Sequence, residues 1–136
     1  MAGDEQLHLK LPAEADNVAV IREAVGTRAK ELGLEESAVD DLKTVVSEAC
    51  ANVVLHAYPD DARQRPLEVE MGWTERAVNV VVRDQGIGIR PASGLRSPSL
   101  RLGLQLIGAL ASCFQIRSGR DHGTELVIQL ALPGEA

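Results

Sequence analysis

The sequence predicts a two-layer α/β sandwich in which a mixed, mostly antiparallel sheet carries helices on one face. Runs that alternate apolar and polar residues indicate strands, and runs with apolar residues every three or four positions indicate helices. They follow the order strand, two helices, two strands, loop, helix, two strands. Two pairs of strands are separated by only a few residues, as in hairpins, and hairpins join antiparallel strands.

The first part of the chain predicts a strand and then a helix. Residues 7–12, LHLKLP, alternate apolar and polar positions and end at a proline, as a short strand does. Apolar residues recur at helical spacing from Asp16 or Asn17 to Leu32, and Gly33 can end that helix.

A second helix is predicted from Ser37 to about His56. Ser37 followed by Asp40 resembles a capping box in which Asp stands in for Glu. Residues 58–66, rich in proline and charge, predict a turn or loop. The core stripe of the helix is expected to consist of Val39, Leu42, Val46, Ala49 and Val53.

The second half of the chain predicts two hairpins separated by a loop and a helix. Residues 85–99 hold three Gly, two Pro and three Ser and predict a long loop, which in a compact domain is more often functional than idle. A helix is expected from Leu100, with Leu104, Ile107 and Leu110 or Ala111 facing inward. The strands are expected at residues 67–73, 77–84, 113–118 and 124–132.

Length, charge and composition narrow the class of protein. At 136 residues we expect one domain over residues 1–136. A net charge of -6 and three aromatic residues argue against a nucleic-acid partner, which needs clustered Lys and Arg or a base-stacking platform. No apolar run approaches the length of a membrane span, and the N-terminus does not resemble a signal peptide. Cys50 and Cys113 form no CxxC pair, which favours reduced cysteines in a cytoplasmic protein, and the three His share no metal-ligand spacing.

The segment VVVRDQGIGI ends a valine-rich strand on Asp84 and places Gly86 and Gly88 at alternate positions. An ordinary strand exit also contains Asp and Gly. A dinucleotide fingerprint fails because its third glycine would fall at Pro91, and the chain has no P-loop motif. An ionised Asp only accepts hydrogen bonds, which suits the exocyclic amine of adenine, and glycines let backbone lie flat against a base. Asp84 is therefore a candidate adenine reader.

The second predicted helix carries Glu48, Asn52 and His56 along one stripe, because residues four apart are rotated by only about 40°. A carboxamide oxygen suits Mg²⁺, which prefers oxygen ligands. A nearby carboxylate that stays off the metal can orient or deprotonate a hydroxyl group. The plain alternative is a solvent-exposed polar face, which is what most charged helix faces are.

Two further positions are candidates for phosphate contacts. Gly103 stands where the loop is expected to become a helix, and a helix N-terminus offers free amides and a positive dipole end. A glycine that simply turns the chain is the plain alternative. Gly123 and Thr124 open the last strand, where the Thr hydroxyl can hydrogen-bond a phosphate.

In this order the segments resemble the Bergerat ATP-binding fold, the superfamily of gyrase, mismatch-repair ATPases and histidine kinases. Within it, SEACANVVLHAYPDD, VRDQGIGI and LGLQLIGALAS are most similar to the anti-sigma factor serine kinases of bacteria. The similarity runs from about Ser37 to Leu132, and the three spaced motifs agree with the predicted elements.

The resemblance implies a role for each matched residue. Asn52 would coordinate the Mg²⁺ that bridges the ATP phosphates, and Glu48 would be the base that activates the serine of a protein substrate. Asp84 would bind the adenine amine, with Gly86 and Gly88 shaping the pocket. The remaining nucleotide contacts would come from Gly103 and Leu104 at the phosphates and from Thr124 at the adenine side.

The loop from Arg90 to Arg101 would be the ATP lid, and Arg101 departs from the family pattern. The family usually has glycine at this position, the first of the motif G-x-G-L. Arginine cannot turn as glycine does, but it can reach a phosphate.

Three functions fit these features. The first is a cytoplasmic protein-serine kinase that sequesters a sigma factor and phosphorylates an anti-anti-sigma antagonist, using ATP and Mg²⁺, as a homodimer by resemblance. The second is a partner-switch protein that binds nucleotide but transfers no phosphate. The third is a Bergerat ATPase module detached from a larger machine. Glu48 favours the first over the second, and the lack of a transducer domain in the sequence disfavours the third.

Overall fold

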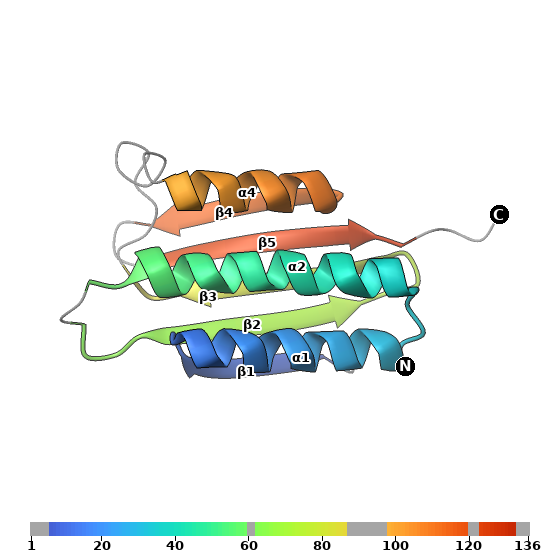
Figure 1. Ribbon diagram of the computed structural model, residues 1–136, viewed down its shortest axis with the longest axis horizontal. Helices are drawn as coiled ribbons and strands as arrows, with labels where there is room; N and C mark the ends of the chain where they lie inside the picture. Colours follow the sequence, from blue (N-terminus) through green and yellow to red (C-terminus); the bar gives the residue numbers. More distant parts are fainter. Residues whose placement is uncertain (1–5, 60–61, 87–97, 120–122, 133–136) are drawn as a thin grey trace.

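The computed structural model describes residues 6–59, 62–86, 98–119 and 123–132 (Figure 1). In this part of the chain five strands form one sheet in the order β1-β2-β3-β5-β4. The elements are β1 (Leu7–Pro12), α1 (Ala15–Glu31), α2 (Glu36–Asn52), η2 (Val53–Ala57), β2 (Pro66–Trp73), β3 (Ala77–Asp84), α4 (Pro98–Leu110), β4 (Cys113–Gly119) and β5 (Gly123–Ala131).

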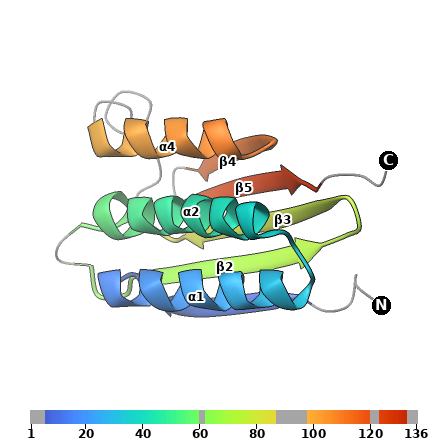
Figure 2. The ribbon, with the colours of Figure 1, turned by 45° about the vertical axis from the view of Figure 1, so that its right-hand side comes forward.

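The predicted two-layer sandwich is confirmed. All four strand pairings in the sheet are antiparallel, and β3 lies between β2 and β5. Helices α1, α2 and α4 lie side by side on one face of the sheet, as two views of the ribbon show (Figures 1 and 2). Among the described residues, the other face of the sheet carries no helix, and we call it the open face.

The core lies between the helices and the sheet. Because alternate side chains of a strand point to opposite faces, β2 buries every second residue, Val69 and Met71 among them, and leaves its glutamates half-buried on the open face. Helix α1 contributes Ile21 and Val25, and α4 contributes Ile107. The five residues of the predicted core stripe of α2 are all buried, as expected. None of the described helices is long and apolar enough to cross a membrane.

Two helix boundaries differ from the prediction. Helix α2 begins at Glu36, its N-cap residue is Glu35, and no side chain caps it. The predicted capping box is therefore wrong, because Ser37 already lies in the first turn. Helix α4 begins at Pro98 rather than Leu100, since proline is well tolerated in a first turn.

The second helix also changes its winding before it ends. It is α-helical to Asn52 and continues as the π-helix η2, so only the wider turn reaches the predicted end near His56. Short π-helices are rare and are often found at functional sites.

Candidate functional site

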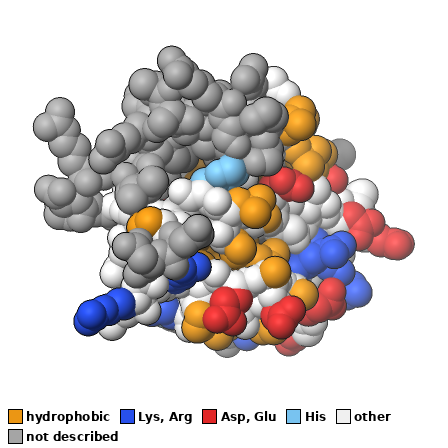
Figure 3. Space-filling view, turned by 60° about the vertical axis from the view of Figure 1, so that its left-hand side comes forward, with side chains coloured by type: hydrophobic (Ala, Val, Ile, Leu, Met, Phe, Trp, Pro, Cys, Tyr) orange, Lys and Arg blue, Asp and Glu red, His pale blue; other side chains and the backbone are white. Residues whose placement is uncertain are grey.

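The candidate site lies at one end of the sandwich, on the left in Figure 1. The end of α2 with η2, the end of β3, the start of β5 and the first turns of α4 meet there. Figure 3 turns this end forward, and the described part of this surface intersperses acidic and basic side chains around hydrophobic ones.

Glu48 and Asn52 lie against the backbone of α4. An ideal Cβ on Gly103 would stand 3.2 Å from each of three side-chain atoms: Nδ2 and Oδ1 of Asn52 and Oε2 of Glu48. Gly103 is itself buried, and the two polar side chains are half-buried. The stripe predicted from helical spacing is therefore not an open solvent face, because the lack of a side chain on Gly103 lets α4 approach it closely.

Asn52 has an unsatisfied donor. Its Nδ2 is buried and has no hydrogen-bond partner among the described residues. A buried polar group left unpaired costs about 1–3 kcal/mol, so such a group is expected to gain a partner in another state. A carboxamide is also a suitable oxygen ligand for Mg²⁺. The Asn52 carboxamide is thus suited to pair with a bound ligand.

Asp84 is held by two backbone amides. Asp84 as a whole residue is only 7% exposed. Its Oδ1 accepts hydrogen bonds from the amides of Gly86 at 2.9 Å and Thr124 at 3.2 Å. Burial raises the pKa of the Asp84 carboxyl above its ordinary value, while the hydrogen bonds from these two amides oppose that shift. A carboxylate this well fixed presents its acceptors in a defined direction.

Two glycines make the close packing around Asp84 possible. A Cβ on Gly86 would stand 1.9 Å from the carbonyl oxygen of Ala57, and one on Gly123 would stand 2.1 Å from that of Asp84. Gly123 also has a φ of 74°, in the left-handed region. The space at both positions is filled by backbone, so any side chain there would push strands or helix apart.

Several predicted site residues are placed less completely. Gly88 and residues 90–97 of the predicted lid lie outside the described residues. Arg101 belongs to α4. Gly103 and Leu104 are the sixth and seventh residues of that helix, so the prediction that Gly103 stands at the loop–helix junction is wrong. Interior helix amides bond to carbonyls four residues earlier, whereas the first four are free. The phosphate roles of Gly103 and Leu104 therefore stay predictions.

Sequence reasoning missed Tyr58. Its hydroxyl bonds to the backbone at Pro66 and Gln85, which are 8 and 27 residues away. No periodicity in the sequence indicates such partners. The one available signal was that a lone tyrosine follows the predicted helix directly.

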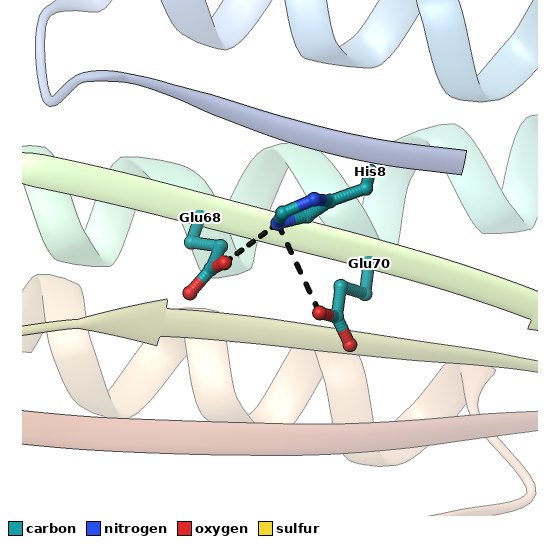
Figure 4. Close-up of side chains that lie close together, drawn as sticks. All are labelled: His8, Glu68 and Glu70. Carbon is teal, nitrogen blue, oxygen red and sulfur yellow. Dashed lines mark hydrogen bonds and ion pairs between the residues drawn. The ribbon is translucent and has the colours of Figure 1, made fainter. Parts of the chain in front are cut away.

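A second polar cluster lies on the open face (Figure 4). His8, Glu68 and Glu70 place three ligand-type atoms within 4.8 Å of one another, a group that could hold a metal ion. Spacing in the sequence missed it because its members come from two strands. However, Nη1 of Arg83 lies 3.2 Å from Oε1 of Glu70 and 3.8 Å from Oε1 of Glu68. A cation therefore already neutralises these carboxylates, which makes the cluster a poor candidate metal centre.

Comparisons with known proteins show the family to which the chain is similar. The family model described as Histidine kinase-like ATPase domain matches residues 11–130. The chain is 32% identical over 138 residues to the serine-protein kinase RsbW of Bacillus cereus strain AH820, covering 91% of this chain and 83% of that protein. It is 31% identical over 139 residues to the protein of the same name in Bacillus thuringiensis strain Al Hakam, with the same coverage.

Among solved structures, the fold is similar to the histidine kinase domain of the blue-light activated histidine kinase of Erythrobacter litoralis EL346. The TM-score is 0.61 at 18% identity, and the match covers 90% of this chain and 62% of that one. A second structure of that kinase gives 0.61 at 22% identity, covering 73% of this chain and 32% of the other. At these identities the likeness shows the fold alone.

Proposed function

The chain belongs to the histidine kinase-like ATPase domain family and, within it, to the anti-sigma factor serine kinases, and from this premise we propose that it binds ATP with Mg²⁺ and phosphorylates a serine of a partner protein. The observation that carries the proposal is the close approach of Gly103 to both Glu48 and Asn52, at the same end of the sandwich as the fixed carboxylate of Asp84.

At the adenine end, the proposal gives Asp84 the exocyclic amine of the base. An ionised carboxylate can only accept, and adenine offers a donor at that position. Thr124 lies beside Asp84 through its amide hydrogen bond, which supports its role at the adenine side. Gly86, with Gly88 two residues on, would shape the pocket.

At the phosphate end, Asn52 would hold the Mg²⁺ ion through its carboxamide oxygen, and Gly103, Leu104 and Arg101 would contact the phosphates. Bound Mg·ATP would supply the transferable phosphoryl group, with the metal offsetting its charge. Glu48 would accept the proton of the substrate serine hydroxyl as that oxygen becomes the nucleophile. Glu48 lies one turn from Asn52, which separates the proton acceptor from the metal ligand.

The partners proposed are a sigma factor, which the protein sequesters, and an anti-anti-sigma protein, which carries the serine. Large apolar side chains flank the site and support a protein partner: Leu55 is 63% exposed three residues after Asn52, and Leu102, next to Gly103, is 65% exposed. A homodimer belongs to the same proposal. So does a cytoplasmic location, which the free cysteines Cys50 and Cys113 support.

A phosphotransfer assay tests the proposal. The protein is incubated with labelled ATP and Mg²⁺ together with candidate antagonist proteins, and transfer to a serine is expected. Titration calorimetry with Mg·ADP should show binding that weakens when the metal is chelated. The proposal would be contradicted if the protein bound no adenine nucleotide in a buffer that contains Mg²⁺.

A nucleotide-binding switch without transfer is the second candidate. Arg101 favours it, since arginine replaces the glycine that the family usually has there. Tight nucleotide and partner binding without transfer to any antagonist would select this alternative.

A further inference from the structure

Tyr58 joins two backbone groups at the edge of the candidate adenine site. It is the sole tyrosine of the chain, and it follows η2 directly in an extended conformation. Its hydroxyl donates to the carbonyl of Pro66 at 2.5 Å and accepts from the amide of Gln85 at 2.9 Å. Both roles of the phenol are therefore satisfied by backbone.

The two groups that Tyr58 joins are the next facing pair of the β2–β3 ladder. The last pair in register is Leu67 with Asp84, so one further step sets Pro66 opposite Gln85. Proline has no N–H and can offer only its carbonyl there. The phenolic oxygen takes the position between that carbonyl and the Gln85 amide, which ends the ladder and fixes where the chain leaves β3.

This anchor holds the turn that carries the adenine carboxylate. Gln85 lies between Asp84 and Gly86, whose amide donates to Oδ1 of Asp84 at 2.9 Å. On the other side, Gly86 packs on the carbonyl of Ala57, the neighbour of Tyr58 in sequence. Residues 57 and 58 thus fix the turn at two consecutive points, one by contact and one by hydrogen bond.

We propose that Tyr58 is a positioning residue for base recognition: its hydroxyl fixes the turn at residues 84–86 so that the Asp84 carboxylate selects adenine over guanine. The inference rests on the proposed function, in which Asp84 binds the adenine amine. Guanine presents a carbonyl where adenine presents an amine, so a fixed carboxylate accepts from one base and repels the other.

The surroundings of Tyr58 suit this role. Burial raises the pKa of the Tyr58 hydroxyl, the hydrogen bond from Gln85 lowers it, and the nearby charge of Asp84 raises it. The hydroxyl therefore stays protonated and keeps its donated hydrogen bond. Because η2 alone separates Tyr58 from Asn52, one short segment positions both the adenine reader and the proposed Mg²⁺ ligand.

The test compares the binding of Mg·ADP and Mg·GDP by titration calorimetry in the parent and in Tyr58→Phe, which keeps the ring but removes both hydrogen bonds. We expect the Kd for Mg·ADP to rise about tenfold, equivalent to about 1.4 kcal/mol, while the Kd for Mg·GDP hardly changes. The preference for adenine then falls about tenfold.

The matched control is Ser112→Ala. The Ser112 hydroxyl accepts a hydrogen bond from the amide of Ala131 at 2.7 Å, near the end of β5 that is far from Asp84. Removing the Ser112 hydroxyl therefore removes a backbone hydrogen bond away from the site. We expect the control to leave the adenine preference unchanged.

The inference is overturned if Tyr58→Phe keeps the parent's ratio of the Kd for Mg·GDP to the Kd for Mg·ADP. It is also overturned if the variant loses affinity equally for both nucleotides, in proportion to the fraction of unfolded protein. Either result leaves the proposed function intact. A parent that binds neither nucleotide overturns both.

Discussion

Asp84, the proposed adenine reader, illustrates at the residue scale how a carboxylate is kept buried at the expense of stability. The carboxylate is buried, and among the residues that the structure describes it accepts hydrogen bonds from two backbone amides. Its pKa is raised because the effect of burial outweighs that of those hydrogen bonds. A raised pKa means that the folded state binds the proton more readily than the unfolded state. The free energy of unfolding therefore falls as the pH rises from the pKa of Asp84 in the unfolded chain through its higher pKa in the folded protein.

We accordingly expect Asp84→Asn to be at least as stable as the parent at neutral pH, because the amide keeps an oxygen acceptor and removes the buried charge. The stability difference should shrink as the pH falls and Asp84 becomes protonated. Binding of adenine nucleotides should weaken by about 1–3 kcal/mol, since a charge-assisted acceptor becomes a mismatched amide. Thermal unfolding across pH and titration calorimetry measure the two effects. A variant that binds ATP as tightly as the parent would show that Asp84 does not read adenine.

In the proposed function Glu48 and Asn52 have separate roles, Glu48 in proton transfer and Asn52 in metal binding. In Glu48→Gln we expect phosphoryl transfer to fall by about 10²–10⁴-fold, the usual contribution of a positioned base, with little change in nucleotide affinity. In Asn52→Ala both transfer and Mg²⁺-dependent affinity should fall, because the proposed metal ligand is lost. Initial rates and calorimetry on the same preparations distinguish the two. Equal transfer rates in the parent and Glu48→Gln would remove the base assignment.

Residue type and spacing were enough to bring Glu48 and Asn52 together, because both lie one turn apart on a single helix. The same reasoning could not find the Tyr58 hydroxyl bridge, which depends on where two strands end. Nor could it find that the Asp84 carboxylate accepts a hydrogen bond from the backbone amide of Thr124, 40 residues later in the chain.

At the scale of elements, close backbone contacts set the geometry of the site. Helix α4 meets α2 through Gly103, and the turn after β3 meets η2 through Gly86. The sequence predicted both glycines as binding residues, but not that each is required first for packing. Such contacts form between segments far apart in sequence, which local patterns do not describe. The capping box failed for a related reason, since α2 gains its stability from its buried stripe rather than from a side-chain cap.

Gly86→Ala should therefore destabilise the protein strongly. The new Cβ would meet the backbone carbonyl of Ala57 at 1.9 Å, where no flexible side chain can give way. We expect a loss of about 3 kcal/mol or more in the free energy of unfolding, together with loss of adenine binding. Denaturant unfolding measures the first effect.

The matched control is Gly72→Ala, in β2. Its Cβ would meet only the Gln6 side chain, at 3.7 Å, so we expect a change within about 1 kcal/mol, in the stabilising direction. If both variants unfold at the same denaturant concentration, the contact between Gly86 and Ala57 does not limit stability.

At the scale of the whole molecule, one row of charges crosses the open face of the sheet. The strand registers align alternating basic and acidic residues on all five strands: Lys10, Glu68, Arg83, Glu125 and Arg117. Arg83 stands at the centre, and its Nε lies 2.7 Å from Oε2 of Glu125. The alternation of polar and apolar residues indicated the strands themselves. The order of the strands, which creates the row, required the three-dimensional pairing.

Arg83 has a specific task in this row, because it neutralises Glu68 and Glu70 beside His8. In Arg83→Gln three carboxylates lose their shared cation, and we expect a loss of about 1 kcal/mol at low salt, modest because these side chains are partly exposed. The variant should also gain a metal response. With the guanidinium gone, His8 and the two glutamates offer one nitrogen and two carboxylates, a ligand set that suits Zn²⁺.

Added Zn²⁺ should therefore raise the Tm of Arg83→Gln but not that of the parent, since a ligand that binds only the folded state stabilises it by mass action. The double variant His8→Ala with Arg83→Gln is the control and should lose the response, because it lacks the nitrogen ligand shown in Figure 4. Circular dichroism melts with and without Zn²⁺ measure all three proteins. An equal rise in Tm for the parent would mean that Arg83 does not keep metal from the cluster. No rise in Arg83→Gln would mean that the three ligands cannot close around an ion.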